Sequence, residues 1–300
     1  MRTVKITAPR TRRRVRAIGT RTVSRTRKAD LPLGYVLYRG PSAIDGAPIV
    51  VILTGYTAAR KAVRKTGKTG ANSKTGAMLQ MYILRADVLP LFAIAHGLDS
   101  SICGGCIHRG RLDKLTGRYR GRTCYVEVGK GATNVYRTFH RGRYVDATGY
   151  SPEQLVAIVT ELGVTYGVRF GAYGDPAAIP AATGIVPTLR NAAAFTTGYT
   201  HQWRATFSAH LRGLIMASCD TPEDRTRATS AGWATFTVHA PGVDPFAAGE
   251  MPCPASKEMG HLVTCSDCKG CDGTPGHDYA IIAHGFAGSR YTGRRALPVI

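Results

Sequence analysis

Four cysteines near the end of the chain have a spacing that is typical of a metal centre. Cys265, Cys268 and Cys271 follow the pattern C-x2-C-x2-C, and Cys253, which precedes a proline, is separated from Cys265 by eleven residues. One tetrahedral zinc is usually held by two separated C-x2-C pairs, because a short loop closes over two thiolates of one ion. Three closely spaced cysteines with a remote Cys-Pro are the pattern of a four-iron cluster site. The spacing therefore favours an iron–sulfur cluster and leaves zinc as the alternative.

The residues around these cysteines predict a loop. Gly260, Gly270, Gly273 and Gly276 interrupt the segment, so we expect little apolar core around it. Four thiols without a metal would then have no packing role, which again favours a metal site.

A second cysteine group lies near the middle of the chain. Cys103 and Cys106 form a C-x2-C pair, and Cys124 follows seventeen residues after Cys106. Three thiols leave one coordination position open, and an open position distinguishes catalytic from structural metal sites. Cys219, His108 or a non-protein ligand could complete the set, although Cys219 also fits the role of a small buried hydrophobe.

Three further polar residues each follow a predicted strand. They are Asp175, His201 and Asp220. In βα folds the residues at the carboxyl ends of the strands face the active site, so we expect these side chains to position a substrate or transfer protons. The plain structural alternative is that Asp175 and Asp220 cap the helices that follow them.

The elements that carry these residues predict an α/β protein. Between residues 151 and 240, strands are expected at 168–173, 193–200, 213–218 and 233–238, and helices at 151–162, 177–191 and 223–231. That spacing is typical of βα units and predicts a partial or complete TIM-like barrel with irregular metal-binding loops. Earlier strands are expected at 33–38, 49–53 and 78–84, and earlier helices at 58–63, 87–96 and 133–142. The predicted segments are an arm at 1–30, an N-terminal part at 31–150, a βα core at 151–240 and a metal-binding loop with a tail at 241–300.

The charge of the chain predicts nucleic acid as a partner. Its formal net charge is +21, and residues 1–28 contain eleven Lys and Arg but no acid, which predicts a disordered basic arm. Such an arm binds phosphate backbone without sequence preference. Residues 60–74 and 109–143 extend the basic surface, with a solubilising tail as the alternative reading of the arm.

Residues 65–76 form a loop rich in Gly and Lys, but its spacing fails the phosphate-loop motif G-x4-G-K-[ST]. Its amides and ammonium groups could still bind an anion. The chain has no run of eighteen apolar residues and no signal-peptide core at its start, so we expect no membrane span and a cytoplasmic location, where clustered cysteines indicate metal ligands rather than disulfides.

Several of these stretches resemble, in order, a family of bacteriophage proteins, the gene-product-88-like group. The matching stretches are residues 72–75, 103–125, 173–176, 198–201, 218–220 and 253–271. The resemblance implies a phage protein in the host cytoplasm and carries no activity with it. Within the matching stretches, Asn72, Lys74 and Tyr125 are predicted to bind a cofactor.

The order of the elements also resembles a shortened radical-SAM barrel, with an early cysteine triad, βα units and a second cluster. That resemblance implies a four-iron cluster on Cys103, Cys106 and Cys124 that binds S-adenosylmethionine. The chain departs from the usual C-x3-C-x2-C motif of those enzymes, because its spacing is C-x2-C-x17-C.

Three functions are compatible with these patterns. The favoured one is a metal-dependent, iron–sulfur enzyme acting on or near nucleic acid. The second is a zinc-stabilised nucleic-acid-binding protein without catalysis. The third is a nuclease or replication protein that uses Asp175, His201 and Asp220 around a divalent ion.

Overall fold

The fold was obtained as a computed structural model that describes residues 31–64, 75–161, 163–244, 250–260, 263–285 and 287–293. The basic arm at 1–28 and the loop residues Asn72 and Lys74, which were predicted to bind phosphate or a cofactor, lie outside the described residues.

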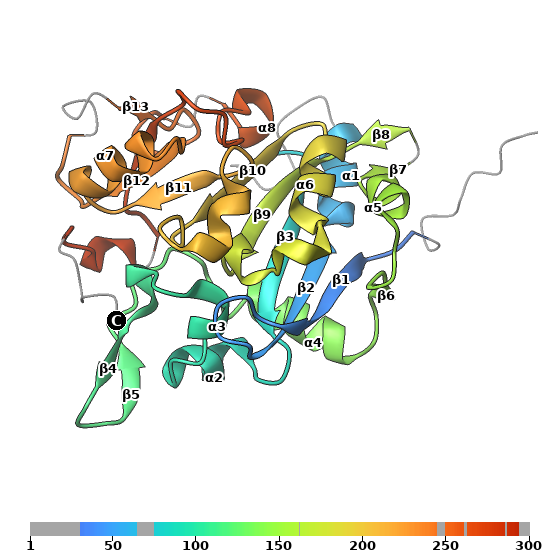
Figure 1. Cartoon of the computed structure of the whole chain (residues 1–300), viewed down its shortest axis with the longest axis horizontal. Coiled ribbons are helices and arrows are strands. Elements are labelled where there is room, and N and C mark those ends of the chain that lie inside the picture. The colour runs from blue at the N-terminus through green and yellow to red at the C-terminus, as the bar shows by residue number, and fades with distance from the viewer. Residues whose placement is uncertain are drawn as a thin grey trace, which may run out of the picture. The chain divides into compact units, whose positions relative to one another are not determined.

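One ten-stranded sheet organises the described chain (Figure 1). Its strands are, in spatial order, β13 (Met251–Pro252), β14 (Tyr279–Ile282), β12 (Thr235–His239), β11 (Met216–Cys219), β10 (Thr196–Thr200), β9 (Gly167–Tyr173), β3 (Met78–Arg85), β2 (Pro48–Thr54), β1 (Gly34–Pro41) and β6 (Val145–Asp146). Strand β2 runs antiparallel to both of its neighbours, and every other neighbouring pair is parallel. The predicted α/β class is confirmed. The order of the described strands is open at β13 and β6, so closure into a complete barrel is not seen among them.

The helices are short. They are α1 (Tyr56–Arg64), α2 (Pro90–Ala95), α3 (Ser100–Cys103), α4 (Gly131–His140), α5 (Pro152–Ile158), α6 (Ile185–Ala192), α7 (Pro222–Ser230) and α8 (Cys265–Cys268). The 3-10 helices are η2 (Ile107–Arg109), η3 (Pro176–Ala178), η4 (Ala181–Thr183), η5 (Thr206–Leu211) and η6 (Gly288–Arg290). Two small hairpins pair β4 (Arg111–Asp113) with β5 (Arg118–Arg120) and β7 (Thr160–Glu161) with β8 (Val164–Thr165).

Six parallel strands follow one another in chain order across the sheet: β3, β9, β10, β11, β12 and β14. Because parallel crossovers are right-handed, connections that always step in the same direction lie on the same face of the sheet. Helix α6 accordingly contacts β9, and α7 contacts β11 and β12. The opposite face of these strands is left to other parts of the chain.

Alternation along the strands separates these two faces. In β9, Val168 and Phe170 are fully buried in the main hydrophobic core together with Leu189 of α6. Arg169, which lies between them, and Gly171, which follows Phe170, therefore lie on the other face.

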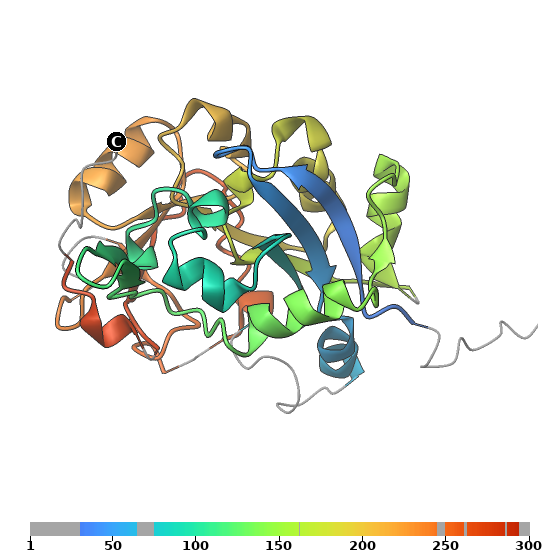
Figure 2. The same cartoon turned by 90° about the horizontal axis from the view of Figure 1, so that it is seen from below.

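The antiparallel strands are covered on both sides. Residues 49–53 of β2 are an unbroken apolar run with no exposed surface, which is typical of a central strand. Helices α2 and α4 lie side by side against β3 (Figure 2), and α5 lies beside α6 (Figure 1). The Tyr56 hydroxyl donates a hydrogen bond to the Ile158 carbonyl at 2.7 Å and ties α1 to α5.

Three sequence predictions need correction. The helix expected at 151–162 starts with the predicted Ser151 cap but ends at Ile158, because the chain then forms the β7–β8 hairpin. The helix expected at 177–191 is divided by Pro180 and by Gly184, whose φ is 61°. The terminal segment, expected to be a loop, contributes β13 and β14 to the sheet.

The sheet takes strands from all three segments predicted after the arm: 31–150, 151–240 and 241–300. Among the described residues, no helix combines the length and the apolar character that crossing a bilayer requires.

Candidate metal and ligand site

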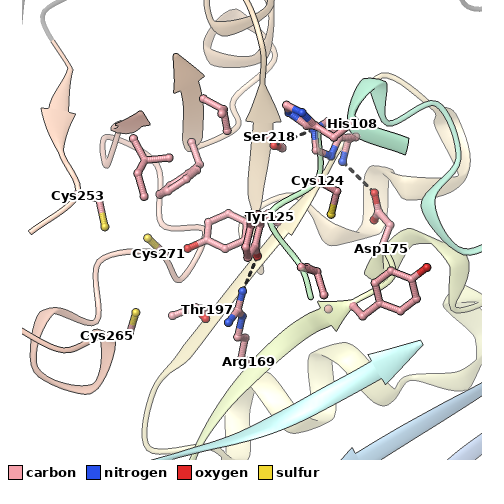
Figure 3. Close-up of a pocket in the computed structure, with 18 of the residues that line it drawn as sticks. His108, Cys124, Tyr125, Arg169, Asp175, Thr197, Ser218, Cys253, Cys265 and Cys271 are labelled. Carbon is pink, nitrogen blue, oxygen red and sulfur yellow. Dashed lines mark hydrogen bonds between the residues drawn. The ribbon is translucent and has the colours of Figure 1, made fainter. Parts of the chain in front are cut away.

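A cavity of about 360 Å³ lies on the face of the parallel strands opposite α6 and α7. Alternate residues of β9, β10 and β12 form part of its lining: Arg169, Gly171 and Tyr173, then Thr197 and Tyr199, then Phe236 and Val238. Seven of the eight cysteines also line it, so both cysteine groups face the same space (Figure 3). A volume of this size suits a small organic ligand.

The first cysteine group is held by a framework of hydrogen bonds. Helix α3 ends at Cys103, and Gly104, with a φ of 53°, turns the chain toward Cys106. The Gln202 side chain donates to the Cys103 carbonyl at 3.0 Å. The backbone amide of Cys124 donates to the His108 carbonyl at 3.1 Å, which brings the third cysteine back to the first two.

Two arginines of the predicted basic insertion build this framework instead of facing solvent. Arg109 donates to Asp99 and to the Gly97 carbonyl, both at 2.7 Å. Arg122 donates to the carbonyls of Cys124 and Val126. The expectation that the whole insertion is a nucleic-acid surface is therefore wrong for Arg109 and Arg122, because each is folded inward to satisfy loop carbonyls.

Burial raises the pKa of two thiols in this group, Cys103 and Cys124. Burial raises the pKa of Cys103 well above its ordinary value, and the charges of Asp99, Cys106 and Cys124 raise it further. The pKa of Cys124 is also raised by burial. A bound metal would favour the thiolate forms that the apolar surroundings disfavour.

Next to the first group lie two histidines and a carboxylate. His108 Nε2 is 3.0 Å from Asp220 Oδ1, and His201 Nε2 is 3.5 Å from Asp220 Oδ2. His108 Nδ1 is hydrogen-bonded to the Thr123 hydroxyl at 2.8 Å, an outer contact that orients the ring. His201 Nε2 also lies 3.1 Å from the Ser218 hydroxyl and 3.8 Å from Cys106 Sγ.

The charges of this group are mutually stabilising. Burial lowers the pKa of His201, but Cys106 and Asp220 outweigh it, so the pKa is raised well above its ordinary value. Burial raises the pKa of Asp220, but His201 and His108 outweigh it and bring the pKa well below its ordinary value. The residues can hold a cation or move a proton.

Asp175 has a positioning role. Its Oδ1 accepts from the Ala177 amide and caps η3, and its Oδ2 accepts from the His201 amide, both at 2.9 Å. The structure thus brings all three predicted strand-end residues to one edge, where Asp175 holds the backbone of His201 and Asp220 contacts its side chain.

The terminal cysteine group is built from a helical turn and two sheet contacts. Thr264 and Asp267 form a capping box around α8, and Lys269 ends the helix in the left-handed conformation, with a φ of 56°. The Cys253 amide donates to the Ala280 carbonyl at 2.8 Å, and the Cys271 carbonyl accepts from the Gly198 amide at 3.3 Å. Burial raises the pKa of Cys271, and the charges of Cys253, Cys265 and Cys268 raise it further.

This group has more apolar surroundings than its glycines predict. Cys253 and Cys271 are buried in a second hydrophobic cluster with Met216, Phe236 and Ile281. The expectation of little core is wrong, because β14 brings apolar residues next to the loop.

The spacing of the sulfurs distinguishes a single ion from a cluster. Sulfurs around one zinc lie about 3.8 Å apart, given tetrahedral angles and Zn–S distances of about 2.3 Å. Among the described residues, which include all eight cysteines, only His108, His201 and Asp220 bring three ligand atoms within 4.8 Å of one another. Neither cysteine group has single-ion spacing. A four-iron cluster takes each thiolate on a different iron atom and does not require single-ion spacing.

Two further residues were predicted as a metal ligand and as a cofactor-binding residue, Cys219 and Tyr125, and the structure places them differently from each other. Cys219 is fully buried in the main core, its Sγ contacts the Ala217 carbonyl, and it does not line the cavity, because it alternates with Ser218 along β11. The structure does not bring Cys219 to either cysteine group. Tyr125, predicted to bind a cofactor, does line the cavity and stacks on His284.

Sequence reasoning missed Arg169, Tyr199 and Ser218 as cavity residues. Their signal was strand alternation: each lies on the opposite face of its strand from a fully buried neighbour. Comparison of the chain with known protein families, with curated proteins and with solved structures finds no match in any of the three.

Proposed function

We propose that this chain is an iron–sulfur enzyme whose active site is the cavity between the two cysteine groups. One observation carries the proposal: seven cysteines in two groups line one cavity, and neither group has the close sulfur spacing of a single-ion site. Bound iron–sulfur clusters would supply one-electron chemistry to a ligand in that space.

The two groups differ in the ligands that they offer. Cys253, Cys265, Cys268 and Cys271 supply four thiolates, a complete set for a four-iron cluster. Cys103, Cys106 and Cys124 supply three and leave one position for His201, whose Nε2 is 3.8 Å from Cys106, or for a ligand in the cavity. We therefore assign reactivity to the first group and a supporting role to the terminal one.

The residues around the first group would handle protons. The paired His201 and Asp220 lie at the carboxyl ends of β10 and β11, and Ser218 extends their hydrogen bonds toward the cavity.

The parallel strands from β3 to β14 follow one another in chain order, which supports a partial βα barrel. A partial barrel in turn supports a radical-SAM-like enzyme with S-adenosylmethionine as a candidate cofactor. The assignments to a phage family and to the host cytoplasm also remain proposals, as does a nucleic-acid substrate, which rests on the net charge of +21.

The test is the metal itself. Protein purified without oxygen should contain iron and sulfide and show broad visible absorbance that bleaches with dithionite. A colourless protein that contains stoichiometric zinc would overturn the enzyme proposal and favour the zinc-stabilised nucleic-acid-binding protein.

A second candidate rests on His108, His201 and Asp220, whose ligand atoms lie within 4.8 Å of one another. Two imidazoles and a carboxylate can bind one divalent ion with open positions, as metal-dependent hydrolases require. This candidate replaces Asp175 in the predicted divalent-ion set with His108. It predicts zinc, manganese or iron bound without sulfide, lost in His108→Ala and retained in Cys268→Ala.

A further inference from the structure

Arg169 lies in the cavity between the two cysteine groups. In Figure 3 its side chain extends from β9 toward Tyr125, with Cys265 and Cys271 to one side and Cys124 to the other. The guanidinium donates one hydrogen bond, to the Tyr125 hydroxyl at 2.5 Å. In the part of the chain that the structure describes, no carboxylate lies within 4.0 Å of it.

Three other arginines that are shielded from solvent have carboxylate partners, and a fourth, Arg122, donates to two backbone carbonyls instead. Arg60 pairs with Glu161 at 2.5 Å, Arg109 with Asp99 at 2.7 Å and Arg190 with Asp272 at 2.9 Å. Withdrawing a charge from water without a counter-ion costs several kcal/mol, so a guanidinium that lacks one in a cavity is a site for an anion.

Two more polar groups in the cavity lack partners. The Tyr173 hydroxyl and the Thr75 hydroxyl are buried, line the cavity and have no hydrogen-bond partner among the described residues. Buried polar groups are normally satisfied, and a ligand would satisfy these.

The rest of the lining sets the body of the ligand. Val126, Phe236, Val238 and Ile281 contribute apolar surface, and Tyr125 contributes an aromatic ring. Among the described residues that line the cavity, Asp175 alone is acidic, and its two oxygens already accept hydrogen bonds from backbone amides. The cavity therefore suits an apolar body with one negative group.

We propose that Arg169 is the anion-binding residue of this cavity, and that the ligand is a small organic molecule with one carboxylate or phosphate group. The guanidinium would bind that group through its free N–H donors, and Tyr125 would hold the guanidinium in place. This proposal names the class of ligand that the cavity would bind. It rests on the proposed function in one respect, which is that both use the same cavity.

The experiment uses full-length protein purified without oxygen and isothermal titration with two matched probe pairs. 3-Phenylpropionate is compared with 3-phenylpropionamide, and phenyl phosphate with phenol, so each anion has a neutral twin and the two pairs separate carboxylate from phosphate. We expect one anion to bind at least tenfold more tightly than its twin. Arg169→Gln should abolish that difference, and Arg169→Lys should retain part of it. Arg118→Gln, which removes one exposed charge from β5, should leave it unchanged.

Metal content, measured on the same samples, separates this proposal from the proposed function. Loss of metal in wild type would concern the function alone, whereas these results overturn the anion site: no binding of either anion, equal binding of anion and twin, or unchanged anion affinity in Arg169→Gln. Loss of metal in both Arg169→Gln and Arg169→Lys also overturns it, because the Arg169 guanidinium would then be needed to hold the terminal cysteine group and not to bind an anion.

Discussion

His108 Nε2 lies 3.0 Å from Asp220 Oδ1, and this contact joins the loop after Cys106 to the carboxyl end of β11. His201 reaches the other oxygen of the same carboxylate. Asp220 thus connects the first cysteine loop to the parallel strands. The negative charge of its carboxylate stabilises both contacts, the one with His108 and the one with His201.

Replacing Asp220 by Asn should destabilise the protein in a pH-dependent way. Because the two histidines bring the folded pKa of Asp220 below its unfolded value of about 3.9, the ionised carboxylate stabilises the fold above that pH. That contribution is lost as pH falls through the folded pKa. In chelator-treated protein, Asp220→Asn should lower the free energy of unfolding by roughly 3 kcal/mol at pH 7. The difference from wild type should shrink in acid.

Urea unfolding at pH 7 and pH 2 checks this prediction, because pH 2 lies well below the unfolded pKa of the carboxylate. Glu258→Gln, which alters an exposed carboxylate away from Asp220, is the control and should cost little. An equal loss at both pH values would show that the carboxylate charge is not what fastens the loop.

The sequence predicted the sheet better than the helices. The strand around Ile52 is an apolar run, those around Met81 and Phe170 are mostly apolar stretches of strand length, and all three are found. Helix ends were less accurate: the segment after Ile158 keeps an apolar pattern but forms a hairpin, because pairing of Thr160 with Thr165 replaces the last helical turn. Local patterns do not report such pairing.

The candidate site was predictable in its residue types but not in its convergence. The spacing of the terminal cysteines and the strand-end positions of Asp175, His201 and Asp220 were visible in the sequence. That both cysteine groups line one cavity depends on β14 joining β12, a pairing between residues more than forty positions apart. The lack of a carboxylate next to the Arg169 guanidinium could not be predicted either. It depends on where the acidic residues of the folded chain lie, which the sequence pattern does not report.

Substituting Cys268 by Ala should remove metal from one site only. Cys268 lines the cavity with the other terminal cysteines, whereas the first group is held by its own framework around Asp99 and Gln202. We expect the iron content per chain to fall by about half, since each four-iron cluster is an independent unit. Cys219→Ala should retain all of the iron. Loss of both clusters in Cys268→Ala would mean that the ligands are shared between the groups.

Gly174 is expected to tolerate no side chain. Its φ is 85°, and an added Cβ would lie 2.5 Å from the Ile83 carbonyl oxygen. Gly46 has a similar φ of 76° but open space around it. Gly46→Ala should therefore cost about 1 kcal/mol of stability for the left-handed conformation alone. Gly174→Ala should cost roughly 3 kcal/mol, because overpacking is added.

Chemical unfolding of the two glycine variants measures the difference. Gly174 precedes Asp175, so Gly174→Ala should also disturb the contact between Asp175 and the His201 amide and reduce metal binding at the first group. Equal costs for the two variants would show that the turn after β9 relaxes freely.

Deleting residues 1–28 should flatten the salt dependence of DNA binding. The segment carries eleven Lys and Arg and no acid, and each phosphate contact that it makes releases a counter-ion, so the slope of log affinity against log salt falls with their loss. Filter binding across a salt series measures that slope. A matched variant neutralises Arg111, Lys114 and Arg118, which are exposed on the β4–β5 hairpin beside the first cysteine group. If this variant flattens the slope and the deletion does not, the hairpin and not the arm contacts the phosphates.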